Sequence, residues 1–270
     1  MGGIENGFLE IGRLDTLAAG DSALHRLDPR AKLLATLVFI VTVVSFDKYT
    51  VSGLAPFFLY PFVLVSAGGL PAGFLFKKLL WVAPFALFIG IANPFLDRDV
   101  LIHLGPLGIS GGWVSFCSIM MRFFLTVSAA LILIALTGFN SVCMALEKLG
   151  TPAPFVVQLL FLYRYLFVLV EEAARMVRAR ALRSFSGRTM PFKTFAPLVG
   201  QLLLRTLDRA QRIHLAMRCR GFDGRVRVLS PLKFGGAELA FAAGWSAYFL
   251  VMRFFDLPHV LGILVTEIMG

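Results

Sequence analysis

The sequence is poor in charged side chains and has long stretches that contain none. Only 16% of its 270 residues are charged and 58% are hydrophobic, against roughly 25% and 45–50% in soluble domains. This composition excludes an intrinsically disordered chain. No Asp, Glu, Lys or Arg occurs in 33–46, 49–76, 79–96, 104–121 and 123–146. Because about 20 apolar residues cross a bilayer, the sequence predicts an all-α polytopic membrane protein with about five spans.

Cysteine and metal-binding patterns are also scarce. Cys117, Cys143 and Cys219 lie far apart, without the spacing of a disulfide framework. The four histidines fall in separate segments, so no metal-ligand spacing is present. The phosphate-binding pattern G-x-x-x-x-G-K-[ST] does not occur. We therefore expect no catalytic centre, no cofactor and no resident metal, and any ATPase that drives this protein must be another chain.

Positive charge is concentrated in one block. Residues 171–233 hold 14 of the 26 basic residues but only 4 of the 16 acidic ones. The block has no nucleic-acid-binding motif, and in membrane proteins Lys and Arg are retained on the cytoplasmic side. Residues 1–32 lack the apolar core of a signal peptide. We expect a cytoplasmic basic block, a lipid bilayer around the spans, and no nucleic-acid partner.

The hydrophobic pattern predicts spans at 32–46, 50–68, 79–96, 113–137 and 235–252, a short helix at 140–149, and long helices at 153–183 and 192–219. Asp28 is expected to cap the first span and Pro29 to occupy its first turn. Lys77 and Lys78 are expected at the end of a basic loop. The whole chain, 1–270, is expected to form a single membrane domain, with 139–233 as a cytoplasmic region inserted before the last span.

Residues 153–170 are apolar enough to cross the membrane, but the positions of the charges argue against it. With the N-terminus inside, a crossing at 153–170 would place the basic block 171–233 outside, against the positive-inside rule. A helix over 153–183 would also be about 45 Å long, too long for a perpendicular span. We therefore predict that it lies at the cytoplasmic face. Arg164, and likewise Arg122 in the fourth span, is expected to form structural hydrogen bonds between helices.

Two further patterns predict helix packing. A 3-4 spacing typical of a paired helix is formed by Leu203, Leu207, Ala210, His214 and Met217. Small residues recur every four positions at Gly236, Ala240 and Gly244, which predicts close packing of the last span on another helix.

Both long helices end in a short arginine motif. The first motif is Ala179, Arg180 and Ala181, and the second is Cys219, Arg220 and Gly221. Further arginines flank them: Arg178, Arg183 and Arg218. A guanidinium group forms bidentate hydrogen bonds to carboxylates, and small neighbours allow a partner surface to approach closely. Two such tips suit a dimeric partner with two equivalent grooves.

The segment HRLDPRAKL at 25–33, the segment YRYL at 163–166 and the paired arginine motifs carry a family resemblance. Over about residues 23–252 the chain resembles the T component, or transmembrane coupling subunit, of energy-coupling factor transporters, and within these the CbiQ-like cobalt transporters. The resemblance implies about five spans and two crossing cytoplasmic coupling helices. It also implies a non-catalytic subunit that transmits the movements of an ATPase dimer to a substrate-binding S component.

By the same resemblance, Arg180 and Arg220 would dock on the ATPase subunits, with Arg178, Arg183 and Arg218 as accessory contacts. The motifs depart from the family's Ala-Arg-Gly pattern at Ala181 and at Cys219. The implied partners are a CbiM-like S component and a small CbiN-like subunit, in the cytoplasmic membrane of a prokaryote. The implied solute is cobalt, with nickel or a vitamin as alternatives.

The main alternative is a secondary transporter or channel that moves a solute by itself. Such proteins place carboxylates or histidines in the middle of the membrane. Between residues 33 and 146 the only acids are Asp47, Asp97 and Asp99, all in expected turns, and Glu238 lies near the end of its span. A membrane-embedded enzyme would need clustered titratable groups, and the sequence shows none.

Overall fold

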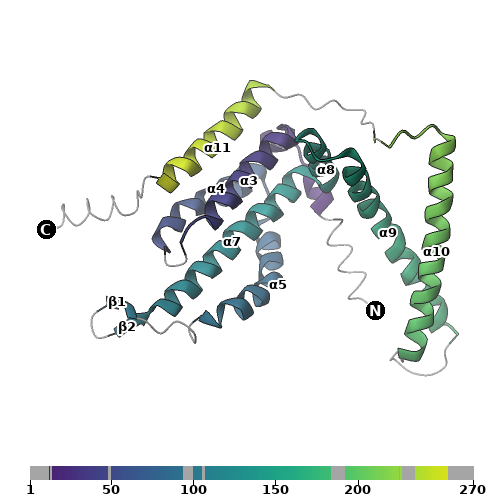
Figure 1. The fold of residues 1–270 in the computed structure, drawn as a ribbon, viewed down its shortest axis with the longest axis horizontal. Helices are drawn as coiled ribbons and strands as arrows, with labels where there is room; N and C mark the ends of the chain where they lie inside the picture. The colour runs from purple at the N-terminus through teal and green to yellow at the C-terminus, as the bar shows by residue number, and fades with distance from the viewer. Residues whose placement is uncertain are drawn as a thin grey trace. The chain divides into compact units, whose positions relative to one another are not determined.

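The computed structural model of this chain describes residues 12, 14–47, 50–93, 100–104, 107–183, 192–224, 226 and 235–254. These residues are almost entirely helical (Figure 1). The chain divides into two compact units. The core unit comprises Leu14–Val142 and Leu232–Gly270, and the helix-pair unit comprises Met1–Arg13 and Cys143–Pro231.

The core unit contains most of the helices. Its elements are α2 (Ala23–Arg26), α3 (Pro29–Val44), the 3₁₀ helix η1 (Ser52–Phe58), α4 (Leu59–Gly68), α5 (Ala72–Gly90), β1 (Val100–Leu104), β2 (Leu107–Ser110), α7 (Gly111–Thr137) and α11 (Gly236–Phe254). The two strands form a small antiparallel hairpin between the predicted third and fourth spans. Helix α8 (Phe139–Lys148) begins in the core unit and continues into the helix-pair unit, which also contains α9 (Ala153–Ala181) and α10 (Phe192–Cys219).

The start of α3 confirms the predicted cap. The Asp28 carboxylate accepts a hydrogen bond from the Arg30 amide at 2.9 Å, and Pro29 occupies the first turn. Proline suits this position because its missing amide would have had no partner inside the helix.

Two predicted spans differ from the structure. The segment predicted at 50–68 begins as η1 and becomes α-helical only at Leu59, since Pro56 has no amide to donate within a helix. The prediction that Lys77 and Lys78 end a loop is wrong. Helix α5 already begins at Ala72, because Gly69 turns the chain with a φ of 62° and lysine is a good helix former.

The core of this unit is an aromatic cluster between α3, η1, α4 and α11. The Phe249 side chain of α11 is fully buried, and its ring centroid lies 5.2 Å from that of Phe39 and 5.1 Å from that of Tyr60. The Tyr60 hydroxyl is hydrogen-bonded to the Thr36 hydroxyl at 2.9 Å, so this buried polar group is satisfied. Apolar residues of α7, among them Leu125 and Ile132, close the cluster.

The predicted small-residue face of α11 is exposed rather than packed. Apart from the backbone of its own helix and its chain neighbours, no atom of the described residues lies within 4 Å of a Cβ placed at Gly236 or Gly244. Helix α11 instead turns Trp245, Tyr248 and Phe249 toward the core cluster, because aromatic side chains remove far more apolar area from solvent than glycine does.

The end of α3 receives two guanidinium groups. Arg122 of α7 donates to the Asp47 carbonyl, and Arg253 of α11 donates to the Ser45 carbonyl at 3.1 Å. Ser45 caps α3, where the helix carries partial negative charge, whereas the Asp47 carbonyl lies in the following turn and also accepts from the Thr50 amide at 3.1 Å. Arg122 thus forms a structural hydrogen bond, but from α7 to the turn after α3 and not, as predicted, to a second helix.

Three helices within the described residues are long and apolar enough to cross a membrane: α5, α7 and α9. The segment Ser52–Gly68 is apolar but shorter. Together with the remaining helices, these elements make the chain an all-α polytopic membrane protein.

Truncation of Phe249 tests the aromatic core. We expect Phe249→Ala to lower the free energy of unfolding by about 3–5 kcal/mol, because a fully buried aromatic side chain leaves a cavity. The matched control is Phe254→Ala, whose side chain is 81% exposed at the end of the same helix. Thermal unfolding of the purified protein in detergent measures both variants, and equal losses would contradict this description of the core.

Candidate functional site

Helix α9 changes character along its length. Residues 153–170 contain a single charged side chain, Arg164, whereas 171–181 contain Glu171, Glu172 and three arginines. The helix is 29 residues long, about 44 Å. Arg164 is exposed and forms no hydrogen bond or ion pair with another described residue, so the helix-to-helix hydrogen bond predicted for it is not found.

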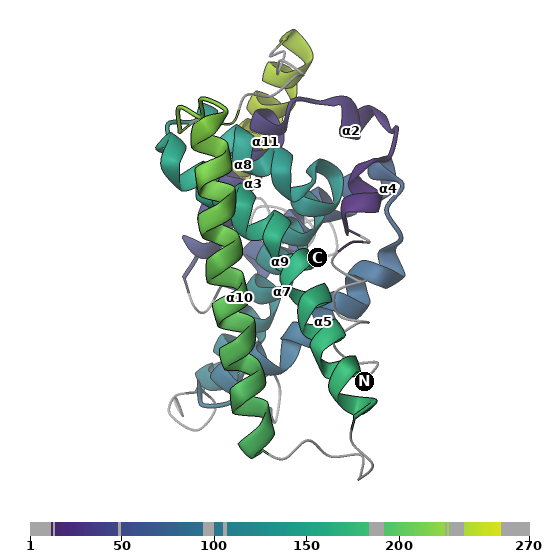
Figure 2. The same cartoon turned by 90° about the vertical axis from the view of Figure 1, so that its right-hand side faces the viewer.

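Helix α10 runs antiparallel to α9 (Figure 1). Phe222, just beyond α10, lies near Phe161 in the first part of α9, with ring centroids 6.4 Å apart. Further along the pair, Arg205 of α10 meets Glu172 of α9. Figure 2 shows α10 along its full length, beside α9. The start of one helix therefore lies beside the end of the other.

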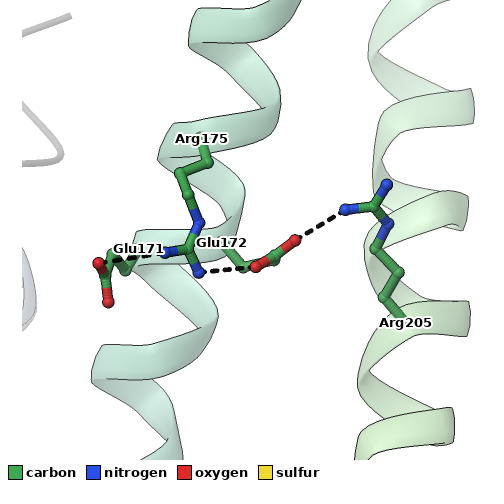
Figure 3. A network of polar contacts seen from close by, with 4 residues as sticks. All are labelled: Glu171, Glu172, Arg175 and Arg205. Carbon is green, nitrogen blue, oxygen red and sulfur yellow. Dashed lines mark hydrogen bonds and ion pairs between the residues drawn. The ribbon is translucent and has the colours of Figure 1, made fainter.

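An ion-pair network joins the two helices (Figure 3). Glu172 accepts from Arg205 of α10 at 2.8 Å and from Arg175 of its own helix at 2.7 Å. Arg175 also donates to Glu171 at 3.2 Å. The Glu172 side chain is only 15% exposed, whereas that of Arg205 is 60% exposed. Glu172 thus bridges α9 and α10 and fixes their register.

The second arginine motif is held by a Schellman turn. The Gly221 amide donates to the Arg218 carbonyl, and the Phe222 amide donates to the Met217 carbonyl, both at 3.0 Å. This turn requires a residue with positive φ after the last helical residues, and Gly221 has a φ of 74°. Arg220 is therefore the last residue before a fixed turn, and its side chain is exposed. The predicted end of this helix at residue 219 is confirmed.

The first arginine motif ends differently. Ala181 is the last residue of α9, and Leu182 keeps a right-handed conformation with a φ of −68°. The Leu182 amide donates to the Arg178 carbonyl at 3.1 Å, and the Arg183 amide to the Arg180 carbonyl at 2.9 Å. Arg180 is half-buried, whereas Ala179 and the flanking arginines are exposed. Without glycine, this helix end has no Schellman turn.

The structure places the two motifs at opposite ends of the helix pair. Phe161 lies beside the end of α10, and Arg180 follows Phe161 by 19 residues of continuous helix. At 1.5 Å per residue, the Arg180 end lies about 28 Å along the pair from the Arg220 end. The motifs therefore do not form one arginine cluster, and each can meet a separate surface.

The predicted packing face of α10 is correct at Met217 and lies one residue away from the observed face at its other four positions. The half-buried side chains among the described residues of α10 are Leu198, Leu202, Thr206, Arg209, Ile213 and Met217. Leu203 and Leu207, which were expected to face the paired helix, are exposed. An exposed apolar row remains on α10: Phe195, Val199, Leu203, Leu204, Leu207 and Leu215. Large exposed apolar rows mark contacts with membrane or protein.

No group of three or more His, Cys, Asp or Glu side chains that could hold a metal ion occurs in the part of the chain that the structure describes. The fold and the site thus define a polytopic membrane protein that carries a long antiparallel helix pair with an arginine motif at each end.

Comparison with known proteins identifies the family. The model of the CbiQ family, described as cobalt transport protein, matches residues 20–230. The chain therefore belongs to the CbiQ family, whose members include T components of energy-coupling factor transporters, and it is a transmembrane component of such a transporter.

Several relatives carry the name energy-coupling factor transporter transmembrane protein EcfT. The protein of Leuconostoc gelidum is 28% identical over 261 residues, covering 87% of this chain and 94% of that protein. The protein of Heliobacterium modesticaldum is 27% identical over 255 residues, covering 86% and 92%. The protein of Bacillus subtilis is 27% identical over 221 residues, covering 76% and 82%. The match extends over both units of the chain.

Proposed function

We propose that this chain couples ATP hydrolysis by a separate ATPase dimer to the movement of a substrate-binding S component. The observation that carries the proposal is the antiparallel pair of α9 and α10, fixed by Glu172 and Arg205 and tipped at opposite ends by Arg180 and Arg220. Two tips separated by about 28 Å are better placed to bind two separate subunits of a dimer than to enter a single pocket. Such a pair transmits movement because packed helices resist deformation.

Arg180 and Arg220 are the proposed docking residues, each entering a groove of one ATPase subunit. Ala179, Ala181, Cys219 and Gly221 leave room for the facing surface, and Arg178, Arg183 and Arg218 add attraction at longer range. Reversing the charge of both docking arginines should release the ATPase. Retention of the ATPase by the doubly reversed chain would contradict the proposal.

The other proposed partners follow from the family. The proposed S component is CbiM-like, with a small CbiN-like subunit, and the proposed solute is cobalt. The family description, cobalt transport protein, supports this solute. The exposed apolar row on α10 is the proposed surface for the S component, because it offers area for a membrane-embedded partner.

We further propose that the N-terminus and residues 139–233 lie on the cytoplasmic side of a prokaryotic membrane. The support is the 14 basic residues in 171–233, which would otherwise violate the positive-inside rule. Helix α9 would then lie along the cytoplasmic face although its apolar part is long enough to cross.

Native Cys219 provides a direct test of this topology. Cys219 is exposed at the end of α10. In a chain whose other cysteines are replaced by serine or alanine, we expect a membrane-impermeant maleimide to label Cys219 in inside-out vesicles and not in intact cells. A cysteine at Thr50, in the turn after α3, is the control and should be labelled from the outside. Labelling of Cys219 in intact cells would show that α9 crosses the membrane.

A further inference from the structure

The segment from His25 to Lys32 forms a buried polar junction in the core unit. Lys32 is only 4% exposed. Its ammonium group donates to the Leu136 carbonyl at 3.1 Å and to the His25 carbonyl at 3.4 Å. The first of these bonds joins α3 to the end of α7, over 104 positions in the sequence.

The Leu136 carbonyl needs this donor because α7 breaks immediately after it. Gly138 turns the chain with a φ of 76°, and no helical turn crosses it. The carbonyl thus lacks the amide four residues on that a continuous helix would supply. A lysine that bonds to such a carbonyl satisfies it and also neutralises the negative end of the helix.

The other side of the junction is equally constrained. The His25 ring donates from Nε2 to the Leu17 carbonyl at 3.0 Å, and its Nδ1 lies 2.6 Å from the Ser22 hydroxyl. The Asp28 carboxylate is buried one helical turn before Lys32 and caps α3. Lys32 is therefore held by residues on both sides and has little freedom to leave the Leu136 carbonyl.

The place that Lys32 holds is where the core unit continues into α8. The chain passes between the two units at three points, after Arg13, Val142 and Pro231. Of these, only the passage after Val142 lies inside a continuous described helix, α8. A helix transmits displacement better than an irregular connection does, but only if its first turn is held in place.

We propose that Lys32 is a positioning residue that fixes the break between α7 and α8, so that movement of the helix-pair unit reaches the core unit instead of being absorbed at Gly138. This role rests on the proposed coupling function. The family resemblance includes Lys32 in the segment 25–33, but neither it nor the ATPase docking assigns this residue a role. If the break between α7 and α8 were flexible, movement of the helix-pair unit would bend the chain there instead of displacing the core unit. ATP would then be hydrolysed without transport.

The test compares Lys32→Met with Lys77→Met in the whole transporter reconstituted into liposomes. Lys77 makes the matched control because it is an exposed lysine of the same unit. We expect Lys32→Met to raise the ATP hydrolysed per solute imported by about tenfold, since a charge-assisted hydrogen bond is lost, and Lys77→Met to leave it unchanged. Lys32→Arg, which keeps the positive donor, should restore most of the coupling. An unchanged ratio in Lys32→Met, with less complex assembled, would make Lys32 merely structural.

Two further experiments keep the proposal falsifiable if Lys32→Met does not fold. Insertion of two glycines after Gly138 leaves the bonds of Lys32 in place and should uncouple the transporter equally, and a fully coupled insertion variant would overturn the proposal. Amide hydrogen exchange at residues 139–142 of the purified chain needs no partner. We expect exchange about tenfold faster in Lys32→Met than in the parent. Equal rates would refute the claim that Lys32 fixes the break between α7 and α8 at Gly138. A parent complex without ATP-driven uptake would instead refute the proposed coupling function.

Discussion

Reversal of both arginine tips, Arg180→Glu with Arg220→Glu, is expected to abolish binding of the ATPase and therefore uptake. Truncating one partner of a buried, hydrogen-bonded charge pair at an interface costs about 2–5 kcal/mol. Reversal adds repulsion from the carboxylates that the arginines would otherwise bind. The loss in affinity should exceed about thirtyfold for each arginine. Affinity purification of the tagged chain with its ATPase measures the loss directly.

The control for the double reversal is Arg212→Glu. Arg212 is exposed on α10, eight residues before Arg220, and lies at neither end of the pair. If the effect came only from net charge, Arg212→Glu would weaken binding as much as Arg220→Glu does. We expect it to retain the ATPase. A doubly reversed chain that still binds the ATPase and supports normal uptake would show that the docking residues lie elsewhere.

The two tips need not respond equally, because they are built differently. Arg220 precedes a Schellman turn that Gly221 makes possible, and Phe222 beyond it packs near Phe161. Arg180 lies in the last turn of α9, without a glycine, and has Arg178 and Arg183 as exposed neighbours. Arg218 flanks Arg220 but lies before the turn, whereas Arg180 has exposed arginines on both sides. We therefore expect single reversal of Arg220 to be the more damaging of the two.

Reversal of Glu172 should separate docking from coupling. Glu172→Arg would bring three guanidinium groups together, at positions 172, 175 and 205, and force α9 and α10 apart. We expect uptake to fall by about fivefold or more, while the ATPase remains bound because neither tip has changed. Distances between spin labels on α9 and α10, combined with uptake assays, measure both effects.

Neighbouring Glu171 provides the control for this experiment. Among the described residues Glu171 bonds to Arg175 of its own helix and to none of α10, and its side chain is 66% exposed, so Glu171→Arg should leave uptake nearly unchanged. Adding Arg205→Glu to Glu172→Arg should restore part of the uptake, since an attraction between the helices is re-formed. Equal losses from the two glutamate reversals would mean that Glu172 does not hold the helix pair.

Local signals in the sequence predicted the helix ends well. The cap by Asp28 and the end of α10 at residue 219 were both predicted correctly, because each depends on the chemistry of a few adjacent residues. The pair Lys77 and Lys78, by contrast, led to a wrong prediction of a helix start. Their charge suggested a loop, but lysine tolerates a helix and its position within α5 follows from where the chain turns at Gly69.

Long-range contacts were harder to predict. The ion pair between Glu172 and Arg205 joins residues 33 apart, and no local pattern selects this pair among the many arginines of the basic block. The packing face of α10 was predicted one residue away from Leu202 and Thr206, because apolar residues occupy both adjoining rows of the helix. On α11, small residues suggested a packing face, yet Phe249 and its aromatic neighbours form the one in the structure.

The buried position of Lys32 also escaped the sequence. Nothing near position 32 indicates that its partner is the carbonyl of Leu136, because that carbonyl becomes available only when α7 breaks at Gly138. Because the acceptor is a main-chain carbonyl, the identity of the side chain at position 136 does not reveal it. The signal that could have found it is the combination of a charged residue in an otherwise apolar helix with a glycine between two predicted helices.

The most direct measurement is purification of the tagged chain from its native membrane, followed by identification of the partner chains and a transport assay of the purified material. A coupling subunit should bring with it two ATP-binding subunits and a substrate-binding membrane protein, and uptake by the reconstituted complex should require ATP hydrolysis. A chain that purifies alone and moves a solute across liposomes without ATP would contradict the coupling function and favour a self-sufficient carrier.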